Sequence, residues 1–192
     1  EKFTLLNRTF SSLANKQKNW QQINDFCLSV SDEEKYQAIG ELANILGVEL
    51  PINAPEKFAP CTWQQLREMQ EWGVEIGGHT VTHPSLGQVT VDKAEYEIKQ
   101  GLLTMNQQLG ERDRSFCYPN GQPTDYNDVI KAITRNSGFK AAVTAFNDCQ
   151  NLKIPFAWRR YSVGSDRFEF EKILFGAVNI SNLISKRQRC EY

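Results

Sequence analysis

The sequence predicts an α/β fold in which helices cover a parallel sheet or barrel. The first observation is length, because 192 residues suit one ordinary domain with a substantial core. The second is composition, because 40% hydrophobic and 23% charged residues are typical of a globular protein. The third is order: from Thr62 onward, helical and strand patterns alternate, which is the signature of a parallel α/β sheet.

Residues 1–58 predict a helical region that precedes this alternation. Apolar residues between positions 20 and 30 recur at helical spacing, which indicates one amphipathic helix. Ser31 and Glu34 form a capping box at the start of a second helix, and Gly47 is placed to end it. We therefore expect two helices here, followed by a proline-containing loop.

The elements after this loop follow from caps, periodicity and chain-breaking residues. They are, in order, a helix over 62–72, a strand over 74–78, a helix over 91–109, a strand over 115–118, a helix capped by Asp125 that runs to 138, a strand over 139–146 and a weaker strand over 161–163. We divide the chain into the helical region 1–58, an α/β domain over 59–176 and a C-terminal tail over 177–192, within a single domain overall.

Charge and hydropathy exclude two classes of protein. The 22 basic and 23 acidic side chains leave a formal net charge of -1, whereas nucleic-acid binding calls for a basic excess. No apolar run approaches the roughly 20 residues of a membrane-spanning helix, and the mean hydropathy is -0.51. The five cysteines form no CxxC pair, so we interpret them as free or buried thiols.

The amino terminus predicts that a further segment lies upstream of Glu1. The chain does not open with methionine, and it has no charged stretch followed by an apolar one, as a secretory leader would. Because any targeting signal would lie in that upstream segment, the cytoplasm and the bacterial cell envelope both stay open as compartments.

Both histidines of the chain lie in the segment GGHTVTHP, directly after the strand predicted at 74–78. His79 and His83 are four residues apart, a spacing that puts both side chains on one face of a helical turn. Neutral imidazoles on one face can bind the same metal ion. The alternatives are two histidines without a ligand role and, for Gly77 and Gly78, a plain turn.

The segment EIGGHTVTHPSL closely resembles the histidine motif of the polysaccharide deacetylases, the NodB-homology domains of carbohydrate esterase family four. The later segment SFCYPNGQPTDYN is similar to that family's aromatic-Pro-x-Gly segment, and GFKAAVTAF and WRRYSVG are similar to its later strands. The resemblance is strong over residues 60–146, weaker as far as residue 176 and poor over residues 1–58.

The resemblance implies a fold, an activity and a site. The fold is a distorted (β/α) barrel with fewer strands than a complete barrel, truncated here by the absence of the first strand or strands. The activity is removal of N-acetyl groups from an amino-sugar polysaccharide or glycan precursor, with one divalent metal, usually zinc. His79 and His83 match the two metal-binding histidines. The family's substrate-groove segment matches Tyr118, Pro119, Asn120 and Gly121, where a main-chain amide would stabilise the oxyanion.

The sequence departs from the family pattern at three places. The Asp-Asp motif of the family is absent, so the general base and the third metal ligand are expected upstream of Glu1. Cys117 stands where the family has an arginine, and Arg160, or with less support Arg159, is our candidate for the arginine that orients the base. No third histidine exists to act as the general acid.

Three functional hypotheses follow from these observations. The first is a metal-dependent deacetylase that acts on an amino-sugar glycan and is inactive as this chain alone if the absent motif is essential. The second is a non-catalytic carbohydrate-binding domain or pseudoenzyme, and the third is a metal-dependent hydrolase of another substrate on a similar barrel. A glycan is the expected partner, and a homodimer is one way to cover the sheet edge that the missing strands would expose.

Overall fold

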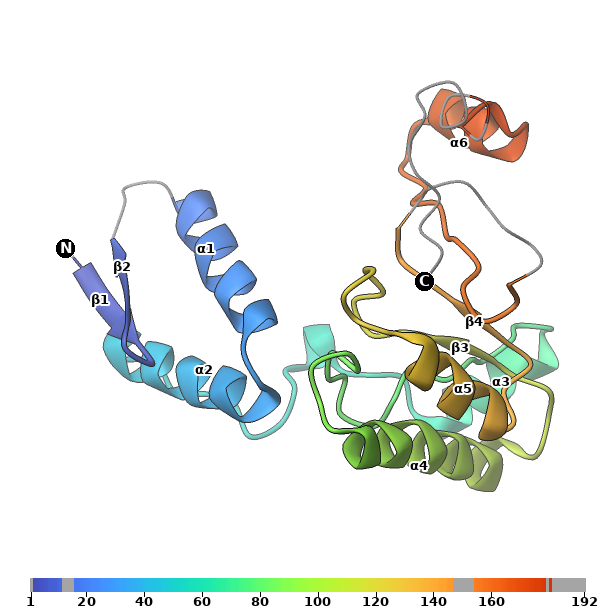
Figure 1. The fold of residues 1–192 in the computed structure, drawn as a ribbon, viewed down its shortest axis with the longest axis horizontal. Coiled ribbons are helices and arrows are strands. Elements are labelled where there is room, and N and C mark those ends of the chain that lie inside the picture. The colour runs from blue at the N-terminus through green and yellow to red at the C-terminus, as the bar shows by residue number, and fades with distance from the viewer. Residues whose placement is uncertain (1, 12–15, 147–153, 179, 181–192) are drawn as a thin grey trace. The chain divides into compact units, whose positions relative to one another are not determined.

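The computed structural model describes residues 2–11, 16–146, 154–178 and 180 (Figure 1). The fold is α/β, as the sequence predicts. The chain divides into two compact units, Glu1–Thr62 and Trp63–Tyr192. Among the helices of the described residues, none is both long enough and apolar enough to cross a bilayer.

The first unit opens with a β-hairpin that the prediction of a helical region did not include. Strands β1 (Lys2–Leu5) and β2 (Arg8–Ser11) pair antiparallel, with Phe3 opposite Phe10. The two residues of the turn, Leu6 and Asn7, have φ angles of 47° and 67°. Two residues in the left-handed region make the turn that matches the twist of a hairpin. Asn is common at such a position but Leu is not, so this turn carries only half of its usual sequence signal.

The two helices predicted in this unit are both confirmed. They are α1 (Lys16–Ser29) and α2 (Asp32–Leu46). The capping box of Ser31 and Glu34 is present in both directions, and Gly47 ends α2 with a φ of 62°. A short 3-10 helix, η1 (Glu56–Phe58), follows. The hairpin and the helices share a small core of buried residues, namely Leu5, Phe10, Phe26 and Ala38.

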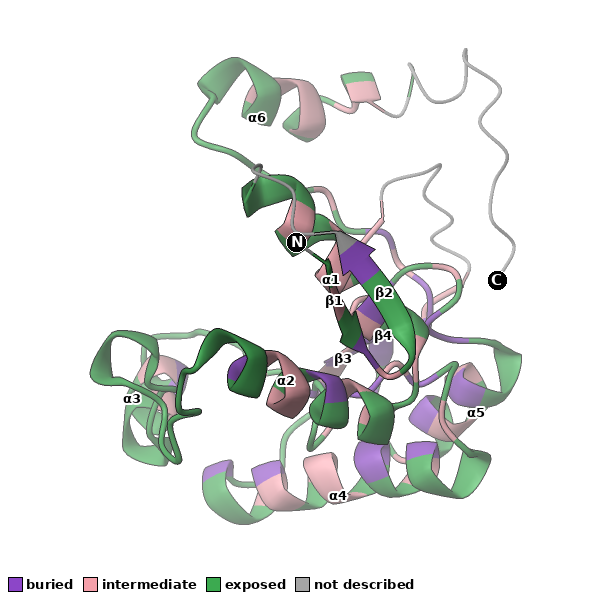
Figure 2. Cartoon of the chain, turned by 90° about the vertical axis from the view of Figure 1, so that its left-hand side faces the viewer, coloured by how far each residue is buried: buried purple, intermediate pink, exposed green. Residues whose placement is uncertain are grey.

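The second unit contains the helices predicted after residue 60. They are α3 (Trp63–Glu71), α4 (Val91–Leu109) and α5 (Asp128–Asn136). A further helix, α6 (Arg167–Leu174), lies near the C-terminus and was not predicted. Helix α4 packs against both α3 and α5. Figure 2 shows buried and exposed positions alternating along α4, as its amphipathic pattern requires.

The start of α5 corrects one prediction, because the N-cap is Asn127 and not Asp125. The Asn127 side chain accepts a hydrogen bond from the amide of Ile130 at 3.0 Å. The carboxylate of Asp125 instead accepts from the amide of Gln122 and from the hydroxyl of Ser85. Asp125 therefore stabilises the loops that precede the helix, while Asn127 caps the helix itself.

The second unit has a parallel sheet that is shorter than predicted. Strands β3 (Ser115–Cys117) and β4 (Ala141–Val143) pair in parallel, with Phe116 opposite Ala142. The segment predicted as a strand over 74–78 makes a single parallel bridge, from Gly78 to Phe116. On the other side of the sheet, the bridge is made at Trp158, next to Val143, and the weak strand predicted over 161–163 does not form. Within the described residues, these segments do not close into a barrel.

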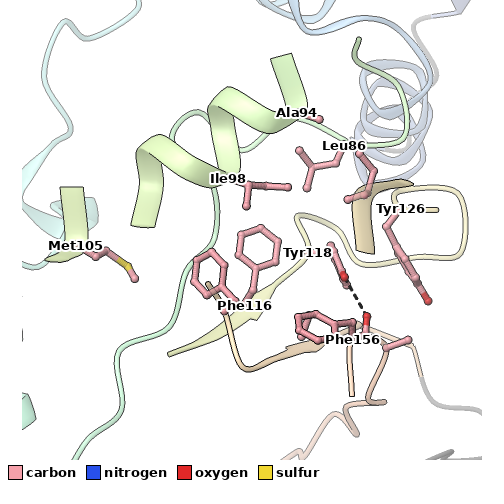
Figure 3. Packing of buried hydrophobic residues seen from close by; sticks show 12 residues of the cluster. Leu86, Ala94, Ile98, Met105, Phe116, Tyr118, Tyr126 and Phe156 are labelled. Carbon is pink, nitrogen blue, oxygen red and sulfur yellow. Dashed lines mark hydrogen bonds between the residues drawn. The ribbon is translucent and has the colours of Figure 1, made fainter. Parts of the chain in front are cut away.

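The core of the second unit lies between the sheet and helices α4 and α5 (Figure 3). Phe116 and Tyr118, from β3 and the residue after it, pack edge to face with ring centres 5.4 Å apart. The hydroxyl of Tyr118 donates to the carbonyl of Phe156 at 2.9 Å, which is the dashed line in Figure 3. The other buried members include Leu86, Ala94, Ile98, Met105, Tyr126, Ile130, Phe139 and Ala142. This aromatic core fixes β3 and therefore fixes the loops at its carboxyl end.

Candidate functional site

Four neighbouring parallel segments end at the same edge of the second unit. Their order across the sheet is the bridge at Gly78, β3, β4 and the bridge at Trp158. His79 directly follows the first segment, the 118–121 turn follows β3, and Arg160 lies just after the fourth segment. Because ligand sites of parallel sheets form at the carboxyl ends of strands, this edge is the candidate site. Residues far apart in the sequence are brought together there.

The histidine loop, residues 79–83, starts from a tightly packed glycine. The Gly78 amide donates to the carbonyl of Ser115 at 2.9 Å, and the Cys117 amide donates to the carbonyl of Gly78 at 2.8 Å. A Cβ atom at position 78 would lie 2.5 Å from the Phe139 ring, so only glycine fits beside this core. The two glycines before His79 are therefore more than a plain turn, since Gly78 joins the histidine loop to β3.

The two imidazoles of the histidine loop lie side by side. Their ring centres are 4.7 Å apart and their planes are nearly perpendicular, at 79°. Each zinc–nitrogen bond is about 2 Å long, so two rings at this separation can reach the same ion. His79 and His83 are both exposed, so the approach of an ion or a substrate is open.

A main-chain contact orients the ring of His79. Its Nδ1 atom lies 2.7 Å from the carbonyl oxygen of Cys117, a contact that requires the proton on Nδ1 and leaves Nε2 as the free lone pair. Burial of part of the ring lowers the pKa of His79, and the neighbouring His83 and Arg160 lower it further, while the bond to Cys117 opposes them. The lowered pKa favours the neutral form of the ring, which is the form that binds metals.

The four residues predicted to line a substrate groove differ in how they are exposed. Tyr118 is fully buried, and Pro119 and Gly121 are buried as well. Burial raises the pKa of the Tyr118 phenol. Asn120, at a φ of 56°, is the most exposed residue of the turn. The side chain of Tyr118 thus belongs to the core, and Asn120 contributes most of the surface that this turn offers to a ligand.

Arg160 and Arg159 take different positions. Arg160 is exposed and donates from Nε to the carbonyl of Thr144 at 2.7 Å. It contributes to the lowered pKa of His79, and it partly opposes burial, which raises the pKa of the Cys117 thiol. Arg159 is buried, donates to the carbonyl of Ala157 at 2.6 Å and lies over the Phe146 ring at 4.4 Å. Of the two candidates, Arg160 is the one at the site.

One residue of the site was not predicted from the sequence. Glu97, in α4, is fully buried and accepts hydrogen bonds from Val81 and Thr82 in the middle of the histidine loop. An acidic residue at a position where the helix is otherwise apolar is the signal that could have identified it, because buried carboxylates are rare unless they are paired.

The sequence of this chain matches the model of a known protein family. The sequence model of the polysaccharide deacetylases matches residues 29–142, which is more than half of the chain. The chain belongs to the polysaccharide deacetylase family. The matched range contains His79, His83 and the 118–121 turn, whereas Arg160 lies beyond it.

Solved structures of polysaccharide deacetylases share the fold. The deacetylase PplD from Streptococcus pyogenes, in complex with acetate, has a TM-score of 0.51 and 23% identity, over 68% of this chain and 52% of that protein. A de-N-acetylase from Aggregatibacter actinomycetemcomitans has a TM-score of 0.51 and 17% identity, over 80% of both chains. A polysaccharide deacetylase from Bacillus cereus has a TM-score of 0.50 and 18% identity, over 66% of this chain and 39% of that protein.

These likenesses concern the fold alone, because all three identities are low. The matched part of this deacetylase-family chain spans about half of the Streptococcus pyogenes protein and less of the Bacillus cereus protein. No curated protein sequence matches the chain.

The donor atoms present fit a divalent metal such as zinc in type but supply only two ligands. Two adjacent imidazoles, one of them oriented by a carbonyl, are suited to zinc. Among the described residues, no group of three or more His, Cys, Asp or Glu side chains is placed to hold a metal. The remaining ligands would have to be solvent, substrate or a carboxylate from outside the described residues.

Proposed function

We propose that this polysaccharide deacetylase-family chain carries the metal-binding half of a hydrolase site that removes N-acetyl groups from an amino-sugar polysaccharide or glycan precursor. The observation that carries the proposal is the pair of adjacent imidazoles at the carboxyl edge of a parallel sheet, with Arg160 and the 118–121 turn at the same edge. The likeness of the fold to solved deacetylases supports the same function.

His79 and His83 would bind a divalent metal, most suitably zinc, through imidazole nitrogens. A bound zinc ion supplies Lewis-acid chemistry, which polarises an acetyl carbonyl and lowers the pKa of water. His79 would use Nε2, because its Nδ1 is engaged with the Cys117 carbonyl. The bond to Cys117 fixes both the tautomer and the plane of the ring before any ion arrives.

The 118–121 turn would bind the substrate through its main chain. The Tyr118 amide donates to the carbonyl of Val143 at 3.2 Å, and the Gly121 amide donates to the carbonyl of Pro119 at 2.6 Å. Proline has no amide hydrogen, so the amide of Asn120 is the one we assign to the oxyanion that forms when the acetyl carbonyl is attacked. The positive φ of Asn120 sets the direction of this amide.

Arg160 would orient an acidic group at the site. Its Nε donates to the carbonyl of Thr144, and a guanidinium held in this way can still donate to a carboxylate from its terminal nitrogens. We propose that this carboxylate is the general base and that it lies outside the described residues. Within those residues, no third acidic or cysteine ligand lies beside the two histidines.

The proposal extends to the architecture of the second unit. Four adjacent parallel segments, with α4 and α5 packed together and α5 packed on β4, are compatible with part of a distorted (β/α) barrel. We also propose that residues 59–176 form this α/β domain and that residues 1–58 form a separate region before it. A homodimer that covers the sheet edge also remains a prediction.

A second candidate is a non-catalytic glycan-binding domain. The observation that favours it is the same absence of a third metal-binding side chain among the described residues. Such a domain would keep the turn and the exposed histidines as a binding surface and would lack the carboxylate that acts as general base.

The first experiment measures bound metal and acetate release together. The purified chain is exposed to zinc, exchanged into metal-free buffer and analysed by elemental mass spectrometry, and acetate release is assayed with N-acetylated amino-sugar oligosaccharides and with simple acetyl esters. About one zinc per chain with acetate release from the sugars supports the deacetylase. One zinc and saturable oligosaccharide binding without acetate release supports the second candidate, and release from the esters alone supports another hydrolase. A chain that retains no zinc contradicts the assignment of His79 and His83.

A further inference from the structure

We infer that Glu97 is a positioning residue that holds the histidine loop in the shape in which both imidazoles reach one ion. Its Oε2 atom accepts hydrogen bonds from the amides of Val81 and Thr82, each at 2.8 Å. Its Oε1 atom accepts from the hydroxyl of Thr82, also at 2.8 Å. Three bonds from a single carboxylate thus fix the two residues that lie between the proposed ligands.

The burial of Glu97 argues that this arrangement is more than a surface contact. The side chain is 0% exposed, and a buried carboxylate is costly unless hydrogen bonds or an ion pair compensate its lost hydration. Lys93, one turn earlier in α4, supplies the ion pair at 3.0 Å from Oε1. The other hydrogen bonds to the carboxylate of Glu97 come from the histidine loop. The loop therefore compensates the lost hydration of the carboxylate, and the carboxylate in turn restrains the loop.

The backbone of the histidine loop needs such a restraint. Thr80 has a φ of 66° and His83 a φ of 60°, which are unfavourable values for residues that carry a Cβ. Within the loop, the amide of His83 donates to Oγ1 of Thr80 at 3.0 Å. A β-branched residue in the left-handed region persists only where the surroundings determine it. Glu97 binds the backbone between these two strained positions, so its loss would move both imidazoles together.

This inference rests on the proposed metal site, and its test separates the two. Glu97→Gln keeps the size of the side chain but turns one acceptor into a donor, which then faces either the loop amides or Lys93. Glu95→Gln is the matched control, because Glu95 lies on the same helix and pairs with Lys99 one turn away but binds no residue of the histidine loop in the described structure.

The measurements are zinc affinity by competition with a chromogenic chelator, the visible absorption spectrum of the cobalt-loaded chain, and thermal unfolding of the metal-free chain. Loss of an outer-shell partner typically weakens metal binding about 10- to 100-fold. We expect a loss of that size and an altered cobalt spectrum in Glu97→Gln, with wild-type affinity and spectrum in Glu95→Gln. A folded Glu97→Gln chain with the affinity and spectrum of the wild type overturns the inference.

If Glu97→Gln does not fold, Thr82→Val tests the positioning role of Glu97 instead. Thr82 is exposed, so this nearly isosteric change leaves the core intact while it removes one of the three bonds to Glu97. We expect a smaller loss of zinc affinity, about threefold to tenfold, and a modest fall in melting temperature, because the buried Oε1 of Glu97 loses one donor. Wild-type affinity in a folded Thr82→Val chain contradicts the inference in that case. If the wild-type chain itself binds neither zinc nor cobalt, the proposed site is what fails, and amide hydrogen exchange at Val81 and Thr82 still reports whether Glu97 restrains the loop.

Discussion

The histidine loop and the 118–121 turn lie at the ends of neighbouring parallel segments, yet they present different atoms to a ligand. The histidine loop exposes two imidazoles, and its backbone is hydrogen-bonded to the buried carboxylate of Glu97 in α4. The turn buries the side chain of Tyr118 completely and is anchored through it to Phe156. One loop therefore offers two side chains to a ligand, whereas the other keeps three of its four residues buried and offers mainly Asn120.

This difference teaches that residues matched to a family motif have different roles. The histidines offer their side chains to a ligand, whereas the side chain of Tyr118 stabilises the core. Removal of an imidazole should abolish metal binding and leave the fold intact. Removal of a side chain in the turn should weaken the fold and leave metal binding intact. Variants of the histidine loop and of the 118–121 turn test this difference in role.

The largest effect is expected from His79→Ala and His83→Ala. Each variant removes one of the two nitrogen ligands that the described residues supply, so zinc affinity should fall at least about a hundredfold, or roughly 3 kcal/mol. Both side chains are exposed, so the free energy of unfolding of the metal-free chain should change by less than about 1 kcal/mol. Zinc titration and urea unfolding measure the two quantities, and retention of wild-type affinity in either variant would contradict the metal assignment.

The next largest effect is on stability, from Gly121→Ala in the turn. Gly121 has a φ of 64°, and a Cβ there would lie 2.6 Å from the amide nitrogen of Ala145. Backbone strain and overlap together should cost about 2–4 kcal/mol.

Gly47→Ala is the matched control for this prediction. Gly47 has a similar φ of 62° in the left-handed helical region, but a Cβ there would meet no atom within 4 Å. Its cost should be the strain alone, about 1–2 kcal/mol. Equal destabilisation of the two variants in urea unfolding would show that packing around the turn is looser than described.

A smaller loss is expected from Tyr118→Phe. The change removes the hydroxyl that donates to the Phe156 carbonyl and leaves that buried acceptor without this partner, at a cost of about 1–2 kcal/mol. Zinc affinity and the KM for an acetylated oligosaccharide should stay at wild-type values, because the side chain does not reach the surface. A raised KM with unchanged stability would show instead that the phenol contacts the substrate.

The smallest effect is a dependence of stability on acid pH that comes from Glu97. Burial raises the pKa of this carboxyl, but the hydrogen bonds from Thr82, Lys93 and Val81 together lower it below its ordinary value near 4.5. A carboxylate whose pKa is lowered in the folded state stabilises the fold above its unfolded pKa and loses that contribution as the pH falls through the folded pKa. The difference in melting temperature between the wild type and Glu97→Gln should therefore be constant above about pH 5.5 and shrink below pH 4.5. A difference that grows toward acid pH would reverse the sign of this argument.

Much of the fold follows from short-range patterns in the sequence. The capping box of Ser31 and Glu34, and Gly47 at the end of α2, act within four residues of the atoms that they satisfy. The amphipathic pattern of α4 likewise identifies its bounds, from Val91 to Leu109. The hairpin at the amino terminus escaped because Leu6 occupies a turn position where glycine or asparagine is the usual signal.

The position of the histidine pair at the end of a parallel segment was predictable from the sequence, whereas the contacts that build the site were not. Two histidines four residues apart after a strand-like segment indicate a metal-binding pair by residue type and spacing. The same sequence gives no sign that Asp125 bonds to Ser85 in place of capping a helix, since the two residues are 40 positions apart. Burial of a polar side chain depends on which distant segment packs over it, and that is a property of the whole fold.

The sequence by itself determined helices α1 to α5, the histidine pair and the likeness to the polysaccharide deacetylases, because each depends on residues that are neighbours along the chain. Only the tertiary structure decided that the side chain of Tyr118 is in the core, that Arg160 and not Arg159 lies at the site, and that Glu97 bonds to the histidine loop. Their partners Phe156, Thr144 and Val81 lie between 16 and 38 positions away. Hydrogen bonds and burial over such separations are set when the segments pack together, and no local pattern encodes them.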